Sequence, residues 1–255
     1  MKVALFLALL LALPALGHGY ATKDLPPERV AISLTYNGED IPISGEAPRD
    51  ADIYVKVSSG GSEERTGLSE KGKVGVFWMT TRRAVVEGMP GMLLIYSTAD
   101  ISSLPEGLQE ELGIDEAYAQ LRREARVVDE GEAGREIKGE ERERFIEGLI
   151  RVKESQGLYA IKEGAVEMKG GRYGAVLHIP PTASVGSDMV DIYVVKGGEV
   201  LEHQRKVLTI ENAGIGGWLT EMAEERSLLY GLMAVIVALS AGLAVGVMFK
   251  GGGGH

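Results

Sequence analysis

The chain has 255 residues, a formal net charge of −10 and no cysteine. The acidic balance argues against nucleic acid as a partner, because a phosphate backbone is bound by clustered Lys and Arg side chains. The absence of cysteine excludes disulfides, thiolate metal sites and cysteine nucleophiles.

The N-terminal residues predict a secretory signal peptide over 1–17. Lys2 precedes an apolar run that ends at Leu16, and small residues follow it. We expect cleavage before His18, with cleavage after Ala21 as a second option. A retained N-terminal anchor is the other interpretation, although the apolar run is short for a membrane span.

The region 22–100 predicts β-structure, because apolar and polar residues alternate with the period of a half-buried strand. Asn37-Gly38 is typical of a hairpin turn. The aromatic pair Phe77 and Trp78, with Met79, is interpreted as core and rim packing. The predicted strands cover 30–35, 53–58, 74–80 and 92–97.

A helical segment is predicted over 101–157. Apolar residues fall at helical spacing between 104 and 128, and Ser103 with Glu106 is typical of a capping box. A loop over 129–139 and a second helix over 140–155 follow, and Gly157 is the expected stop of that helix.

A second β-rich region is predicted over 158–212, with Lys196-Gly197-Gly198-Glu199 as a hairpin turn. Short strands with regular turns favour a mainly β exported region of the immunoglobulin-like β-sandwich type. Two separate sandwiches and one composite sandwich with a helical insertion remain alternatives. The predicted strands cover 158–161, 165–168, 174–179, 190–195 and 200–210.

The C-terminal region predicts membrane attachment. A juxtamembrane amphipathic helix is expected over 213–227, with Trp218 and Tyr230 at headgroup level. The uncharged run 228–249 reaches about 33 Å at 1.5 Å per residue and predicts one transmembrane helix. The signal peptide and Lys250 place 250–255 in the cytoplasm.

Small residues repeat every four positions within this run, which puts them on one stripe of a helix. Such a stripe lets helices approach closely in lipid, so we expect it to pack against a partner or a second copy. Chance is the alternative, because Gly and Ala are common in such helices. The stripe consists of Ala234, Ala238, Gly242 and Gly246.

Few residues are candidates for binding a metal or a small ligand. The free amine and imidazole of His18, with His178 or His203, form one candidate copper site, although flexible or solvent-facing histidines are favoured. Arg82 and Arg83 are a candidate site for a small anion, with a surface pair as the favoured interpretation.

Two aspartates flank an apolar strand. Asp188 and Asp191 are interpreted as solvated strand-edge residues, with an inward-facing Asp191 as the alternative.

Three stretches resemble a known family. They are 30–45, then 75–79 running through Arg82 and Val85 to Met89-Pro90, and finally 227–232. They are similar to the family of transmembrane proteins first described from alphaproteobacteria (Alph_Pro_TM). The resemblance implies an exported domain on one span, with unknown function and no accepted catalytic residues. It also implies a partner in sulfur-compound handling, because genes of the family often lie near a sulfite-exporter-like permease. The tail 251–255 departs from the arginine-rich end that is usual there.

We therefore expect a non-catalytic periplasmic module held at the inner membrane. Its expected partners are the lipid bilayer and a membrane protein or a second copy. The alternative is a periplasmic protein that binds a small anion or copper. An enzyme is not expected.

Overall fold

A computed structural model describes residues 29–32, 37–59, 65–74, 76–131, 134–212 and 214–250. The predicted signal peptide, His18 and the tail 251–255 lie outside these residues. Strands make up most of the regular structure that is described, so the expected mainly β character is confirmed.

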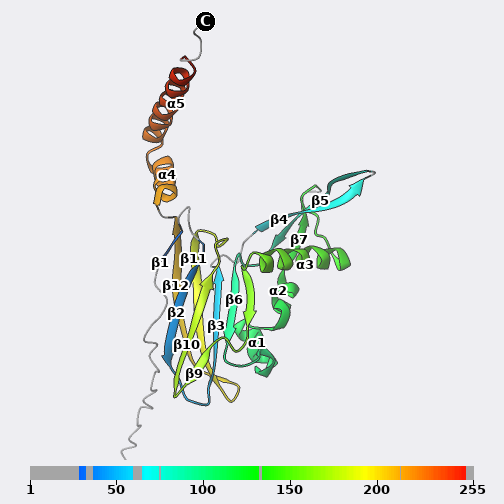
Figure 1. Cartoon of the computed structure of the whole chain (residues 1–255). Coiled ribbons are helices and arrows are strands. Elements are labelled where there is room, and N and C mark those ends of the chain that lie inside the picture. The colour runs from blue at the N-terminus through cyan, green and yellow to red at the C-terminus, as the bar shows by residue number, and fades with distance from the viewer. Residues whose placement is uncertain are drawn as a thin grey trace, which may run out of the picture.

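The central layer is a six-stranded sheet that is buried on both faces (Figure 1). On one of its strands, Ile53 and Val55 enter one core and Tyr54 enters another, because successive side chains point to opposite faces. In spatial order the strands are β1 (Arg29–Ile32), β12 (Glu199–Asn212), β11 (Gly186–Lys196), β3 (Asp52–Ser59), β6 (Leu93–Ser97) and β8 (Tyr159–Lys162).

A three-stranded sheet covers one face of the central sheet and completes a β-sandwich. Ile41 and Leu177 of this sheet lie in the same core as Val55. Both β-rich regions of the sequence contribute strands to both sheets, so they form one composite sandwich. Its strands are β2 (Glu39–Glu46), β10 (Arg172–Ile179) and β9 (Glu167–Lys169).

The helical segment and a third sheet stand beside the sandwich (Figure 1). Ile146 and Leu149 pack with Tyr54 and Tyr159 in a second core. The helices are η1 (Ile101–Ser103), α1 (Glu106–Leu112), η2 (Glu116–Tyr118), α2 (Ala119–Glu124) and α3 (Gly139–Ser155), and the strands are β4 (Arg65–Val74), β5 (Phe77–Glu87) and β7 (Arg126–Asp129).

The helix expected over 104–128 is broken into short pieces. Ala117 and Tyr118 adopt left-handed backbone conformations (φ 53° and 57°), which end one helix before the next begins. No side chain caps α1, so the capping box is absent. The end of the predicted helix is strand β7, which pairs with β5. The second predicted helix is confirmed as α3.

Two turn predictions had different outcomes. Gly197 and Gly198 have positive φ between β11 and β12, which confirms that hairpin turn. Asn37-Gly38 does not join a hairpin, because β1 pairs with β12 while β2 pairs with β10. The strand predicted over 74–80 is interrupted by the reversal between β4 and β5: Val74 ends β4 and pairs with Phe77, and 77–80 are the start of β5.

The C-terminal region forms α4 (Gly214–Glu225) and α5 (Ser227–Lys250). Among the described residues, no helix is long and apolar enough to cross a membrane. The predicted transmembrane helix over 228–249 is therefore wrong.

A close approach between neighbouring strands of the three-stranded sheet gives the first prediction. A Cβ at Gly45 would lie 2.4 Å from the hydroxyl of its strand partner Tyr173, whereas one at Gly174 would meet only a carbonyl at 3.7 Å. We expect Gly45→Ala to lower the free energy of unfolding by about 1–3 kcal/mol through overpacking. Gly174→Ala is the control and should change it by much less. Urea unfolding measures both, and equal losses would contradict this packing.

Candidate functional site

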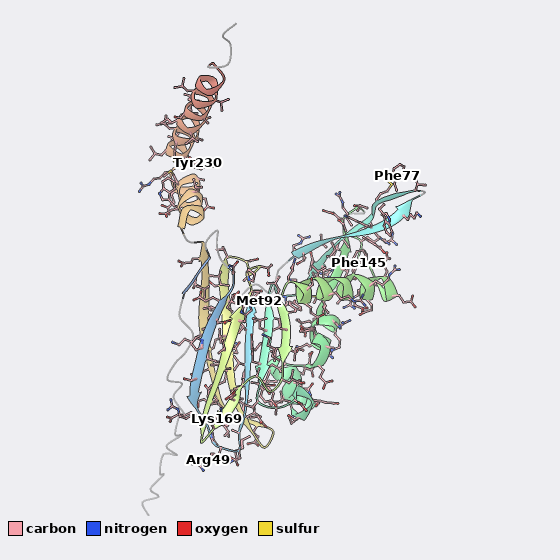
Figure 2. The ribbon with its side chains drawn as sticks, viewed as in Figure 1. Arg49, Phe77, Met92, Phe145, Lys169 and Tyr230 are labelled. Atoms are coloured by element: carbon pink, nitrogen blue, oxygen red, sulfur yellow. The ribbon has the colours of Figure 1, made fainter. Side chains whose placement is uncertain are left out.

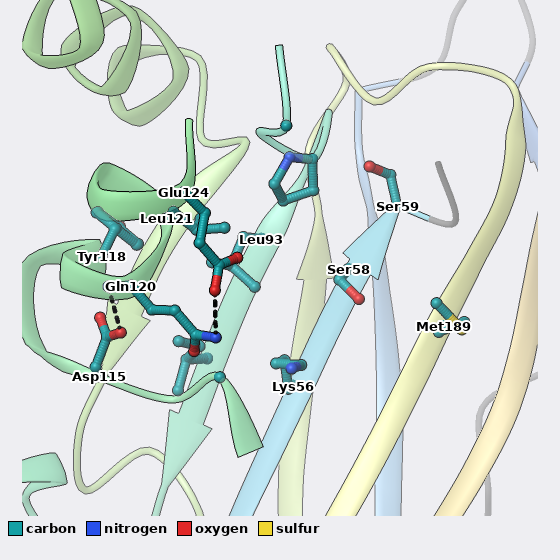
Figure 3. A pocket seen from close by; sticks show the side chains of 14 residues that line it. Lys56, Ser58, Ser59, Leu93, Asp115, Tyr118, Gln120, Leu121, Glu124 and Met189 are labelled. Carbon is teal, nitrogen blue, oxygen red and sulfur yellow. Dashed lines mark hydrogen bonds between the residues drawn. The ribbon is translucent and has the colours of Figure 1, made fainter. Parts of the chain in front are cut away.

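A cavity of about 350 Å³ lies between the central sheet and the helical segment (Figure 3). Strands β3 and β6 form one wall, and η2 and α2 form the other. Asp115 accepts hydrogen bonds from the backbone N–H groups of Ala119 and Gln120 (2.6 and 2.7 Å) and so fixes the start of α2. Gln120 donates to Glu124 (2.9 Å), and its own Oε1 is buried without a hydrogen-bond partner.

Lys56 is the cation of this cavity. Its Nζ donates to the carbonyl of Leu112 at the C-terminus of α1 (2.5 Å), where a positive charge meets the negative end of the helix dipole. Gly113 follows with φ 60°, and a Cβ there would lie 3.0 Å from Nζ. Desolvation lowers the pKa of Lys56. Lys56 therefore joins α1 to the central sheet.

A buried carboxylate lies on the same face of the central sheet. Asp191 is 1% exposed and accepts hydrogen bonds from His203 Nε2 and Arg205 Nε, both at 2.6 Å. The His203 ring stacks on Tyr193 at 4.4 Å. The hydrogen bond to Asp191 raises the pKa of Arg205. The inward-facing alternative for Asp191 is thus the observed one, and Asp188 is also buried.

The structure separates the candidate copper ligands. His178 lies on β10, on the outward side of the three-stranded sheet, and its Nδ1 is 2.7 Å from Asp40. His203 lies on the helical side of the central sheet, across the sandwich core. His18 is outside the described residues. No cluster of three His, Cys, Asp or Glu side chains suited to a metal occurs among the described residues. Copper binding stays a prediction.

Arg82 and Arg83, the candidate anion site, have different environments. Arg82 forms ion pairs with Asp129 (2.9 Å) and Glu141, so two carboxylates already neutralise its guanidinium. The hydrogen bond to Asp129 raises the pKa of Arg82. Arg83 is exposed on the neighbouring position of β5. Anion binding by the pair would require Arg82 to give up these partners.

Apolar side chains are exposed in two places. Phe77 and Trp78, at the reversal between β4 and β5, are 70% and 73% exposed, so their predicted core and rim packing is wrong. Residues 76–79 form the hairpin tip. Along α5, Leu228, Leu239 and Leu243 are 89%, 69% and 72% exposed.

The predicted helix-packing and interfacial residues also lie on the C-terminal helices. Trp218 on α4 and Tyr230 on α5 are partly exposed. A Cβ added at Gly242 or Gly246 would meet no atom within 4 Å, so the stripe with Ala234 and Ala238 is open. Its packing role stays a prediction.

Sequence reasoning missed Lys56 and the hairpin tip. The alternation along β3 placed Lys56 on the polar face, which is correct, but gave no sign that helices cover that face. The run 76–79 is apolar at every position, which fits a buried strand as well as an exposed tip. The two glycines that flank Val74 within 72–75 were the available signal of a reversal.

The fold and these surfaces define a β-sandwich module in which Lys56, Asp191 and Arg82 have partners within the fold. Its exposed surfaces include large apolar side chains. A family model described as "Putative transmembrane protein (Alph_Pro_TM)" matches residues 22–251. The chain belongs to this family, whose function is unknown. Searches of curated proteins and of solved structures found no match.

The cavity wall gives a prediction for alkaline pH. Burial raises the pKa of Tyr118 to about 12, and nearby Glu154 acts in the same direction. The unfolded chain ionises this phenol near pH 10, while the folded chain keeps the proton. Stability should therefore fall from about pH 10 to 12, by about 1.4 kcal/mol per pH unit from this group.

Replacement of this phenol tests the assignment. Tyr118→Phe should make the decline of the free energy of unfolding between pH 9 and 11 less steep than in the wild-type chain. Urea unfolding in mild detergent measures it. An unchanged slope would show that Tyr118 is not buried as described.

Proposed function

We propose that this protein is a non-catalytic, exported module that associates with a membrane and supports a membrane-protein partner. The sandwich lies on the periplasmic side of the inner membrane, and the C-terminal helices make the attachment. Membership of a family described as transmembrane proteins supports the membrane association. The predicted signal peptide supports export.

The exposed apolar surface of α5 carries the proposal. Val235, Ile236 and Val237 are consecutive and more than half exposed, and Leu239 extends the set. At about 100° per residue these four positions cover about 200° of the helix circumference, and Val245, which is also more than half exposed, lies in the remaining gap. A helix that is apolar all round needs an apolar environment, because water solvates such a surface poorly. Lipid is the environment that fits a membrane family.

The polar groups support a non-catalytic role. The charged groups of these clusters have partners within the fold: Lys56 holds α1, Asp191 holds Arg205 and His203, and Arg82 holds two carboxylates. The chain has no cysteine and only four histidines, so the side chains that most often act as nucleophiles or bases are few.

Flotation with lipid vesicles tests the membrane association. The double variant Leu239→Glu/Leu243→Glu places two charges on exposed apolar positions of α5. We expect its vesicle-bound fraction to fall by at least about tenfold, because each buried leucine contributes about 1.5–3 kcal/mol. Leu201→Glu/Val207→Glu makes the same change on exposed positions of β12 and is the control. A wild-type chain that does not float would contradict the proposal.

Affinity purification from native membranes tests the partner. Gly242→Ile/Gly246→Ile fills the open stripe of α5 and should abolish association with a membrane protein or a second copy, because bulky side chains keep helices apart. Leu243→Ile is the control, since it keeps a large side chain outside the stripe. A sulfite-exporter-like permease is one candidate to look for. Association that persists in the double glycine variant would refute the packing role.

A further inference from the structure

The β4–β5 hairpin extends beyond the rest of its sheet as a two-stranded ribbon. Pairing between β4 and β5 runs from Arg65 and Glu87 to the reversal at Val74 and Phe77, but β7 pairs only with 84–87. An isolated two-stranded ribbon is marginally stable in water. The hairpin tip carries four large apolar side chains, each more than half exposed: Val76 80%, Phe77 70%, Trp78 73% and Met79 51%.

The apolar side chains occupy both faces of the ribbon. Phe77 and Met79 point to one face and Trp78 points to the other, because side chains alternate along a strand. A protein partner with a flat surface would cover one face and leave the other in water. A lipid environment surrounds both faces, so the distribution favours lipid.

The charges around the tip point to an anionic surface. Between Lys71 and Arg83 the sequence holds no Asp or Glu, in a chain whose net charge is −10. Arg82 in this stretch is already paired with Asp129 and Glu141, so the positive charge of the tip comes from Lys71, Lys73 and Arg83. Lys71 and Lys73 are exposed; Lys73 pairs with Trp78 in the tip, and Lys71 pairs with Thr80, the residue after the tip. Basic residues beside an apolar, aromatic surface are typical of segments that bind at the interface of anionic membranes.

The hairpin tip and α5 lie at the same end of the molecule. In Figure 2, Phe77 at the tip and Tyr230 near the start of α5 stand at about the same level, and Lys169 lies at the opposite end of the sandwich. One surface could therefore contact both the tip and the start of α5.

We infer that the hairpin tip is a second membrane-binding element, which inserts Phe77 and Trp78 into the headgroup region of an anionic bilayer while Lys71 and Lys73 contact lipid phosphates. This inference rests on the membrane association proposed above. It adds the lipid class and a second point of contact, so that the sandwich is held in a fixed orientation.

The fluorescence of Trp78 tests the inference in the full-length chain. The chain has two tryptophans, so Trp218→Phe leaves Trp78 as the only reporter. With vesicles of phosphatidylcholine and phosphatidylglycerol, we expect its emission to shift to shorter wavelength. Lipids brominated near the headgroup should quench it more strongly than lipids brominated near the chain end.

Charge variants test the choice of anionic lipid. In the Trp218→Phe background, Lys71→Glu/Lys73→Glu should remove most of the shift, whereas Lys169→Glu, at the far end of the sandwich, should keep it. Circular dichroism checks that each variant is folded. An equal shift with pure phosphatidylcholine would overturn the anionic preference.

Flotation of the same samples separates this inference from the proposed function. Flotation together with a shifted Trp78 emission supports both the proposed membrane association and the hairpin inference. Flotation with a Trp78 emission that stays as in water overturns the hairpin inference and leaves the proposed function standing. A shift that appears only when a membrane protein is added also overturns it, in favour of a protein partner. Absence of flotation contradicts the proposed function itself.

Discussion

The central sheet is buried on both faces, and the other layers are arranged around it. Its strands β3 and β11 alternate between two cores, so a polar side chain on either strand enters a desolvated environment and needs a partner. Lys56 and Asp191 are two such residues, and they sit opposite each other in the register of these strands. Leu112 ties the helical segment to the sheet, and His203 and Arg205 link β12 to the neighbouring strand β11.

This constraint explains why the polar clusters do not form an obvious reactive site. Two charged groups that the sequence offered as candidates for chemistry are held within the fold: Asp191 by His203 and Arg205, and Arg82 by Asp129 and Glu141. The apolar side chains on α5 and at the hairpin tip differ from these paired charged groups, because they are exposed on the surface of the described fold. The surfaces, rather than the cavity, are therefore the better basis for a functional proposal.

The sequence predicted the parts of the fold that depend on local patterns. The alternation along 53–58, the glycine pair at 197–198 and the apolar spacing of 140–155 correspond to β3, a hairpin turn and α3. It could not predict the pairing of β1 with β12, which joins distant residues, or the left-handed residues Ala117 and Tyr118 that divide a helical pattern. The predicted membrane span was wrong. The site was the least predictable part, because burial of Asp191 and exposure of Trp78 depend on which layers cover each strand.

Hydrogen exchange of the full-length chain, followed by mass spectrometry with and without phosphatidylglycerol-containing vesicles, tests the central claim most directly. The account predicts that vesicles slow exchange in two separate segments, the hairpin tip at 76–79 and the apolar part of α5, while the strands around Lys56 and Asp191 are unchanged. Protection confined to the cavity between β3 and α2, or no protection in either apolar segment, would contradict it.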